Sequence, residues 1–356
     1  MAKKLQMAFI GSGGISHAHF RALKNFDDVE IVALCDLKEE ALEKAREATG
    51  VDKSMCFTDY KDMLKKVAPQ SVSVCTPNGQ HAPCAIAASN AGAHVIVEKP
   101  MAMNAGEVKK MIAAAKKAKK KLVIGFQYRY APQTEYLTTM RDAGMFGDIR
   151  FGRVWALRRR GIPNWGVFGQ KHLQGGGPMI DIGVHCLEMC HFTMGAPRPV
   201  AACGMAETYM GNREDAAKIK TAWSNWDWKT YTVEDLAVGH IRFDNGAVIH
   251  IEASFAAHHE HQGTMDFQIM GTKGGAKWST SEIYTDVNHY MMDMKPAFLE
   301  KSDFQSLFDR KLRNFADHVL HNKPTQAPAE HGLMVQQMLD AVYESAAKGG
   351  KEVAIK

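Results

Sequence analysis

Along residues 5–126, short apolar runs alternate with longer stretches in which apolar side chains recur every three or four positions. Short runs rich in Val and Ile are typical of strands buried on both faces, and the longer spacing is typical of amphipathic helices. Strands are expected at 5–10, 30–35, 71–75, 94–98 and 121–126. Helices are expected at 17–25, 39–49, 59–67, 81–90 and 105–119. This alternation predicts an α/β fold with a doubly wound parallel sheet and right-handed crossovers.

From residue 125 onwards the pattern changes, because longer strand candidates follow one another. They lie at 149–158, 200–209, 235–243, 247–254, 264–270 and 276–279, and helical spacing is found at 132–143, 304–321 and 331–347. The sequence Asp-Asn-Gly at 244–246 is a hairpin signal between two of the strands. We therefore expect two domains, 1–124 and 125–356, the second of α+β type with a mostly antiparallel sheet. The C-terminal helix is a candidate for packing back onto the first domain.

The composition, with 46% hydrophobic and 23% charged residues, is ordinary for a soluble globular protein. The formal net charge of +5 is mild, and no aromatic-interleaved basic stripe accompanies it, so no nucleic-acid partner is expected. No apolar run is long enough to span a bilayer, and the N-terminus leads straight into a strand, so neither a membrane partner nor a secretory signal is expected. Seven cysteines without a CxxC pair indicate reduced thiols in a cytoplasmic protein.

A glycine-rich turn, Gly-Ser-Gly-Gly-Ile-Ser at 11–16, directly follows the first predicted strand and opens the first predicted helix. Glycines there permit a tight turn and let a pyrophosphate approach the backbone amides of the helix N-terminus. Ser16 replaces the usual third glycine, which weakens the pattern. Asp36 ends the second strand at the position of a ribose-binding acid, and this favours NAD over NADP. The candidate cofactor residues here are Gly11, Gly13, Gly14, Ile15 and Asp36; the alternative is a structural turn without a ligand.

Two further turns are expected at the same edge of the sheet. Thr76 and Asn78 follow the third strand, with His81 at the start of the next helix, and all three are candidates for lining a cofactor site. The tripeptide Glu98-Lys99-Pro100 stands where the strand 94–98 ends. A lysine at the carboxyl end of a buried strand is costly unless it serves a purpose, and ligands of open α/β sheets bind at that edge. A cis Lys99–Pro100 bond is a further hypothesis.

Asp181 and His185 follow the glycine run 175–177 and lie four positions apart, so they share one face of a predicted helix. We expect the glycines to form a flexible turn. A histidine titrates near neutrality and suits removal of a hydroxyl proton, and a nearby lysine suits stabilisation of the developing alkoxide. One alternative is helix capping together with a core histidine. Another is a metal site with Cys186, Glu188, Cys190 and His191, but no second group has zinc spacing, so no metal is predicted.

Taken together, these motifs resemble the Gfo/Idh/MocA family of NAD(P)-dependent oxidoreductases. The resemblance covers nearly the whole chain and rests on the order of the glycine turn, Asp36, Thr76-Pro77-Asn78, Glu98-Lys99-Pro100, the segment 125–129 (Gly-Phe-Gln-Tyr-Arg) and Asp181-Ile182-Gly183-Val184-His185. It implies an N-terminal Rossmann domain and a C-terminal domain with an open-faced, mostly antiparallel sheet. It further implies that Lys99, Asp181 and His185 are catalytic and bind substrate, that Glu98 and Gln127 lie at the nicotinamide end, and that Arg129 is near the substrate pocket.

The resemblance also implies a substrate class, since family members act on sugars, inositols and related polyols. We favour a neutral pyranose or glycoside, for which Arg158 would supply a polar contact and Trp165 an aromatic wall; the alternative for both is rim or interface packing. Trp223, Trp226 and Trp228 crowd one loop, where packing or an interface is favoured over gating.

The leading hypothesis is an NAD(H)-dependent dehydrogenase that interconverts a ring hydroxyl and a ketone. A redox-assisted glycosidase or lyase and a non-catalytic cofactor-binding regulator are the alternatives. The resemblance also implies that the open sheet face joins subunits into a homodimer or homotetramer.

Overall fold

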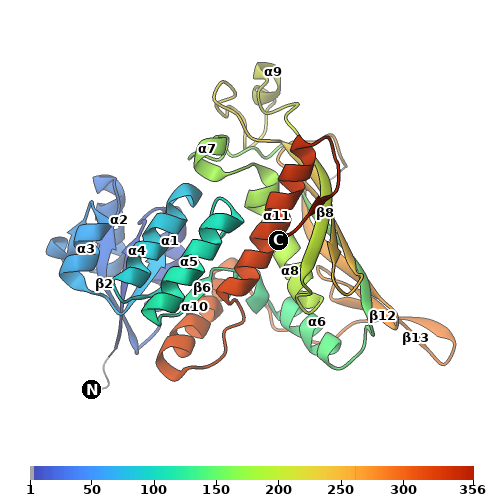
Figure 1. Ribbon diagram of the computed structural model, residues 1–356, viewed down its shortest axis with the longest axis horizontal. Helices are drawn as coiled ribbons and strands as arrows, with labels where there is room; N and C mark the ends of the chain where they lie inside the picture. The colour runs from blue at the N-terminus through green and yellow to red at the C-terminus, as the bar shows by residue number, and fades with distance from the viewer. Residues whose placement is uncertain (1–3, 261) are drawn as a thin grey trace. The chain divides into compact units, whose positions relative to one another are not determined.

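The structure, a computed structural model, describes residues 4–260 and 262–356. The chain divides by its internal contacts into two compact units (Figure 1). The first unit comprises Met1–Tyr130 and Ser302–Leu333, and the second comprises Ala131–Lys301 and Met334–Lys356. The chain therefore returns to the first unit after most of the second is complete.

A parallel sheet forms the centre of the first unit. Within the described ranges it has six strands in the order β3-β2-β1-β4-β5-β6. The strands are β1 (Leu5–Ile10), β2 (Val29–Cys35), β3 (Cys56–Phe57), β4 (Ser71–Val74), β5 (His94–Val97) and β6 (Leu122–Ile124). The helices are α1 (Gly14–Leu23), α2 (Glu39–Thr49), α3 (Tyr60–Val67), α4 (His81–Asn90), α5 (Ala105–Ala118) and α10 (Phe304–His321). The predicted doubly wound parallel sheet is confirmed. The two-residue edge strand β3 was not predicted, because two residues show no periodicity.

The strand order brings four strand ends to one edge of this sheet. Strands β4 and β5 are buried along almost their whole length, as the continuous apolar runs predicted. Because β1, β2, β4 and β5 are parallel neighbours, the turns that follow them lie at the same carboxyl edge. Three short 3₁₀ segments complete the unit: Lys53–Met55, Asn78–Gln80 and Gln127–Tyr130.

The second unit contains a mixed sheet, which in the described part of the chain has nine strands in the order β14-β13-β12-β11-β7-β10-β9-β8-β15. Its strands are β7 (Ile149–Arg158), β8 (Pro199–Glu207), β9 (Leu236–Phe243), β10 (Val248–Ser254), β11 (Gly263–Gly271), β12 (Gly274–Lys277), β13 (Glu282–Val287), β14 (Tyr290–Met294) and β15 (Val353–Ala354). All pairs are antiparallel except β7 with β10. The predicted hairpin at 244–246 joins β9 to β10, with Gly246 at a φ of +81°.

Helices cover one face of this second sheet and leave the other face open (Figure 1). The helices of the unit are α6 (Pro132–Asp142), α7 (Lys171–Gln174), α8 (Val184–Thr193), α9 (Glu214–Ala217) and most of α11 (Ala329–Ala347). Buried and accessible side chains alternate along β7 and β9, as expected of strands with one covered face. The open-faced, mostly antiparallel sheet is thus confirmed. Among the described residues, no helix is both long and apolar enough to cross a bilayer.

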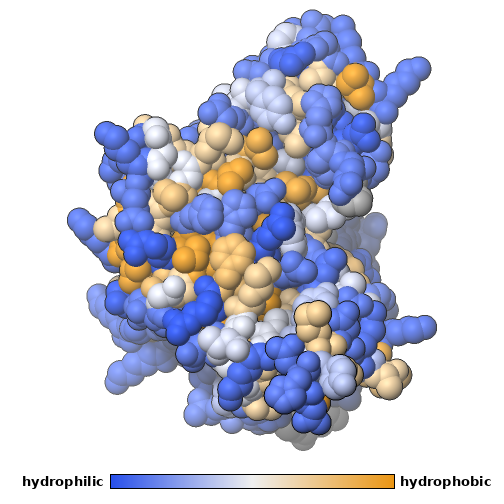
Figure 2. Space-filling model, turned by 90° about the vertical axis from the view of Figure 1, so that its right-hand side faces the viewer, coloured by the Kyte–Doolittle hydropathy of each residue, from blue (hydrophilic) through white to orange (hydrophobic). Residues whose placement is uncertain are grey.

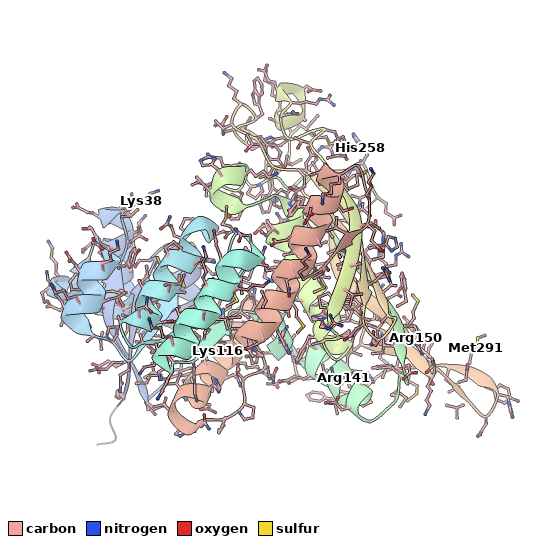
Figure 3. The ribbon with its side chains drawn as sticks, viewed as in Figure 1. Lys38, Lys116, Arg141, Arg150, His258 and Met291 are labelled. Carbon is pink, nitrogen blue, oxygen red and sulfur yellow. The ribbon has the colours of Figure 1, made fainter. Side chains whose placement is uncertain are left out.

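The hairpin β13–β14 was not predicted. Every residue of β14 is exposed, so the strand shows no alternation of buried and accessible positions. Its turn uses Asn288 and His289 at positive φ in place of a glycine signal. Met291, which is 91% exposed, lies on this hairpin (Figure 3).

Candidate active site

The glycine-rich turn joins β1 to α1, as predicted, and its glycines serve different purposes. Gly11 has a φ of +90°, and a Cβ on it would lie 2.6 Å from the carbonyl carbon of Cys75. The turns after β1 and β4 therefore touch, and only glycine fits between them. A Cβ on Gly13 or Gly14 would meet nothing within 4 Å. These two positions consequently border open space, where a phosphate group can reach the backbone.

The start of α1 and the end of β2 complete this region. The N-cap residue of α1 is Gly13, which has no side chain, so the first amides of the helix are not capped by it. Ser16, in place of the third glycine, is buried and donates its hydroxyl to the Gly13 carbonyl at 2.6 Å. The Asp36 carboxylate accepts hydrogen bonds from the amides of Ser12 (2.8 Å) and Lys38 (2.9 Å). The acid is thus fixed beside the turn, where its carboxylate can accept hydrogen bonds from the free ribose hydroxyls of a dinucleotide.

His81 links the loops that follow β4 and β5. Its ring is 1% exposed, with Nδ1 2.7 Å from the Pro100 carbonyl oxygen and Nε2 2.8 Å from the Thr76 carbonyl oxygen. Burial lowers the pKa of His81, and the hydrogen bonds to the two carbonyl groups oppose that shift. A cofactor contact was expected of this residue. In the structure both ring nitrogens lie within hydrogen-bond distance of backbone carbonyl oxygens, so His81 connects the Thr76–Asn78 turn to the turn at Lys99; its cofactor contact stays a prediction.

Lys99 is half-buried and directly follows β5 and Glu98. The hypothesised cis bond between Lys99 and Pro100 is confirmed. Glu98 is only 4% exposed, and its Oε1 lies 2.7 Å from His19 Nε2 and 2.5 Å from Lys311 Nζ. The carboxylate expected at the nicotinamide end therefore has these bonds to α1 and α10, inside the first unit.

The pKa shifts of Glu98 and His19 agree with a charged carboxylate beside a neutral imidazole. Burial raises the pKa of Glu98, but the charge of Lys311 and the hydrogen bond from His19 outweigh it, and the net pKa is well below its usual range. Burial, followed by the charge of Lys311, lowers the pKa of His19 to about 4. A neutral His19 can donate from Nε2 to Glu98 and accept at Nδ1 from the Ser73 hydroxyl, 3.0 Å away.

Sequence reasoning missed His19 and Lys311 as functional neighbours of Glu98. They lie 79 and 213 positions from it, and no local motif connects them. One signal was available for Lys311. It falls within the apolar stripe of α10, among Leu307, Phe308 and Phe315, where a lysine needs a buried partner.

Gln127 and Arg129 lie on the 3₁₀ segment that follows β6. Both are buried, at 4% and 0% exposure. Arg129 Nη1 donates to the Gln326 carbonyl oxygen at 2.6 Å and lies 2.8 Å from Nδ1 of His331. Burial and the Arg129 charge lower the pKa of His331 to about 4, so its neutral ring can accept this bond. Arg129 thus fastens the segment 326–331 within the first unit; its expected role near substrate stays a prediction.

Asp181 and His185 lie in the second unit, at the start of the helix that sequence predicted. The first turn, Met179–Gly183, is a π-helix, and α8 continues from Val184. Single π-turns of this kind are frequent at functional sites. Asp181 is half-buried and His185 is 7% exposed. No group of three or more His, Cys, Asp or Glu side chains in the described ranges is placed to hold a metal ion.

The glycine run before Asp181 was expected to be a flexible turn; the structure has a bend there, and close packing constrains it. A Cβ on Gly176 would lie 2.2 Å from the Tyr343 hydroxyl, and one on Gly177 would lie 2.1 Å from the Glu234 carbonyl oxygen. The glycines are needed for close packing. The buried Glu234 carboxyl, whose pKa is raised by burial, accepts from the amides of Gly177 (2.8 Å) and Met179 (3.2 Å) and from Tyr343 (2.7 Å). No sequence pattern predicted that Glu234 would accept hydrogen bonds from these amides, which lie 57 and 55 positions away.

Arg158 ends β7, and Trp165 lies in the loop that follows. The Arg158 guanidinium lies 4.8 Å from the centre of the Trp223 ring, and Nη1 donates to the Gly161 carbonyl oxygen at 3.0 Å. Burial lowers the pKa of Arg158, and the charge of Asp181 opposes this shift, so the two side chains are electrostatic neighbours. Of the three tryptophans in the 223–228 loop, Trp226 is a packing residue, buried with Nε1 donating to Gly211.

Each unit therefore gathers its own set of predicted residues. At the carboxyl edge of the first sheet are the glycine turn, Asp36, the Thr76–His81 turn and Lys99. In the second unit Arg158 and Asp181 are electrostatic neighbours, and His185 follows Asp181 at the start of the same helix. The first set can hold a dinucleotide, and the second offers an acid, an imidazole and a guanidinium to a polar substrate.

Known proteins match both parts of the chain, and the second match also includes Ser302–Leu333, which belongs to the first unit. Residues 5–126 match the model of an oxidoreductase family with an NAD-binding Rossmann fold, and residues 142–355 match the C-terminal alpha/beta domain of the same family. The chain is 35% identical to a D-glucoside 3-dehydrogenase of Escherichia coli K12, over 97% of this chain and 96% of that protein. It is 25% identical to a myo-inositol 2-dehydrogenase of Thermotoga maritima, over 93% and 92% of the two chains.

A solved structure of levoglucosan dehydrogenase in complex with NADH has the same fold, with a TM-score of 0.83 at 23% identity over 99% of this chain and 100% of that one. Both halves of the family model are matched in order, and a relative above 30% identity matches almost end to end. The chain therefore belongs to the Gfo/Idh/MocA family of oxidoreductases, and its first unit carries the NAD-binding Rossmann fold.

Proposed function

We propose that the protein oxidises a ring hydroxyl of a sugar or glycoside to a ketone, or catalyses the reverse reaction. The observation that carries the proposal is the position of Lys99. It is a half-buried lysine at the carboxyl end of β5, on the same sheet edge as the glycine-rich turn of an NAD-binding fold. Ligands of such sheets bind at this edge, where a fixed cation can stabilise charge on a reacting oxygen.

NAD, when bound, supplies the acceptor for the hydrogen and electron pair that leave the carbinol carbon. We assign the remaining chemistry to Lys99, Asp181 and His185. Lys99 donates a hydrogen bond to the substrate oxygen and stabilises its negative charge as the carbon–oxygen double bond forms. His185 accepts the hydroxyl proton, for which an imidazole is suited near neutral pH. Asp181 orients the substrate by accepting from a second hydroxyl.

The relatives support the substrate class. A protein named D-glucoside 3-dehydrogenase matches nearly the whole chain, and others are named as inositol and D-apiose dehydrogenases. We infer a neutral pyranose or glycoside. Asp36 opposes a 2′-phosphate by its charge, which favours NAD over NADP.

A panel of sugars, glycosides and inositols tests this proposal when each is incubated with NAD or NADP. Reduced cofactor and the altered sugar are measured together. We expect NADH and a keto-sugar from at least one glycoside. An altered sugar without net NADH would indicate redox-assisted bond cleavage, and neither change across the panel would contradict the proposal.

We further infer a homo-oligomer formed through the open face of the second sheet. Figure 2 views this face and shows apolar residues gathered between polar ones. Met205 and Met270 are 42% and 43% exposed there. Light scattering of the purified chain is expected to give the mass of a dimer or tetramer, and a monomer at all concentrations would contradict the inference.

The seven cysteines, all in the described ranges, are free thiols, which supports a cytoplasmic location.

A further inference from the structure

Two tryptophans of the second unit lie against each other beyond the end of β7. The ring centres of Trp165 and Trp223 are 4.8 Å apart, with 33° between their planes. Trp165 is 55% exposed and Trp223 is half-buried. Tryptophan is a costly residue to leave in water, since its ring contributes a large apolar area.

The pair is held in place from both sides. Asn164 Nδ2 donates to the Ser224 carbonyl oxygen at 2.9 Å, which ties the Trp165 loop to the Trp223 loop. The Trp223 amide donates to Thr221 Oγ1 at 3.1 Å. Arg158 supports the Trp223 ring through a cation–π contact at 4.8 Å. The exposed ring therefore belongs to a fixed surface.

Arg158 also connects the tryptophans to the proposed substrate residues. The charge of Asp181 acts on the Arg158 guanidinium, which lies over Trp223. Arg158 contacts Trp223, and Trp223 contacts Trp165, so these three side chains form one cluster in the second unit, which also holds Asp181. A substrate held by Asp181 would extend towards the tryptophans with whatever group it carries beyond the oxidised ring.

We propose that Trp165 and Trp223 form a stacking platform for a second sugar ring, joined by a glycosidic bond to the ring that is oxidised. This inference rests on the proposed sugar oxidation and adds a subsite to it. A pyranose presents an apolar face of C–H groups, which packs well on an indole plane. The platform binds that face, while Asp181 and His185 address the hydroxyls of the reacting ring. The natural substrate is therefore a disaccharide or a glycoside with a ring-shaped aglycone.

The same loop offers a matched control. Trp228 is half-buried with Lys229 Nζ 5.6 Å from its ring centre, whereas Trp165 and Arg158 both contact Trp223. Trp165→Ala and Trp228→Ala therefore remove the same side chain from neighbouring loops, one inside the platform and one outside it. Trp165→Phe keeps a smaller aromatic surface.

The test compares cellobiose with methyl β-glucoside, which share the reacting ring but differ in the second one. We expect Trp165→Ala to raise the KM for cellobiose roughly 5- to 10-fold, the effect of one lost aromatic contact. The KM for methyl β-glucoside should change less than about twofold. Trp165→Phe should recover most of the loss, and Trp228→Ala should change neither KM. Equal effects on both sugars, or none on cellobiose, would overturn the platform.

Calorimetric titration of the NAD-loaded protein separates this inference from the proposed reaction. A wild-type protein that binds cellobiose but turns over no sugar of the panel would refute the proposed reaction only. The ratio of dissociation constants between Trp165→Ala and Trp228→Ala would then still decide on the platform. A wild-type protein that binds methyl β-glucoside as tightly as cellobiose, or binds neither, would overturn the platform whatever the reaction.

Discussion

At the scale of single residues, the Glu98 carboxylate is an ionised group almost fully removed from water. It keeps its charge because Lys311, only 1% exposed, and His19 both contact it. When one partner of a buried ion pair is removed, the other charge stays buried without compensation. The strand end that carries Lys99 therefore depends on a residue 213 positions further along the chain.

Replacing Lys311 should reveal this dependence. Lys311→Met is expected to lower the free energy of unfolding by about 3 kcal/mol, because it leaves the buried Glu98 charge without its ion-pair partner. Denaturant unfolding at neutral pH measures the effect. The control is Lys116→Met on α5 (Figure 3), which removes an exposed pair with Glu330 at 3.2 Å and should cost at most about 1 kcal/mol. If both variants lost the same free energy of unfolding, the buried ion pair would contribute no more to stability than the exposed one.

The pH dependence of stability follows from His19. Its pKa is about 4 in the folded protein, against 6.5 in the unfolded chain. Between these values only the unfolded chain binds the proton, so the stability present above pH 6.5 falls as the pH is lowered towards 4. We expect His19→Gln to reduce the loss of stability between pH 7 and pH 5 by about 2 kcal/mol. Urea unfolding at both pH values measures this difference. If the wild-type protein and His19→Gln lost the same free energy of unfolding between pH 7 and pH 5, a neutral His19 in the folded protein would be contradicted.

The proposed chemistry makes a kinetic prediction for Lys99 and His185. Lys99→Met and His185→Gln should each lower kcat roughly 100-fold or more, as expected when a charge-stabilising group or a general base is lost. NAD affinity, followed by calorimetry, should change little in His185→Gln, because the residue lies in the second unit. Full activity of both variants on the true substrate would exclude the assigned roles.

At the scale of elements, the turn between β1 and α1 separates stability from cofactor binding. A Cβ at Gly11 collides with the Cys75 backbone, whereas a Cβ at Gly13, whose φ is −80°, meets open space. The first glycine is required by the protein's own packing. The second leaves room for a phosphate at the helix N-terminus.

Two alanine variants test this separation. Gly11→Ala should lower the free energy of unfolding by about 1–3 kcal/mol, from strain at positive φ and the close contact. Gly13→Ala should leave stability within about 0.5 kcal/mol and weaken NAD binding roughly tenfold or more. Thermal unfolding and calorimetric titration give both quantities. Unchanged NAD affinity in a stable Gly13→Ala protein would place the pyrophosphate elsewhere.

Much at this scale was predictable, because local patterns record local burial. Apart from the two-residue strand β3, the strands and helices of the first unit follow from buried runs and helical spacing, and the turns with Asp36 and Lys99 follow from the strand order. The π-turn at Met179–Gly183 was not predictable, since a single turn of five residues is too short to show a period of its own. The packing role of Gly176 and Gly177 depends on Tyr343 and Glu234, which are distant in sequence.

At the scale of the whole molecule, the chain leaves the first unit at residue 130 and returns with Ser302–Leu333. Helical spacing identified α10 as a helix, but such spacing carries no information about the unit in which a helix packs. The return is fixed by contacts such as Arg313 with Asp28, at 2.7 Å between Nη1 and Oδ1, and by Lys311 with Glu98. Both pairs join segments far apart in the sequence, so they are visible only in the structure.

The central claim is that hydrogen passes from a sugar ring carbon to NAD. The most direct measurement uses glucosides carrying deuterium at one ring carbon each, incubated with the protein and NAD. We predict that deuterium from one carbon appears in the reduced cofactor and that a ketone forms at that same carbon. Reduced cofactor without the label from any ring carbon, or no reduced cofactor from any glycoside the protein binds, would contradict the account.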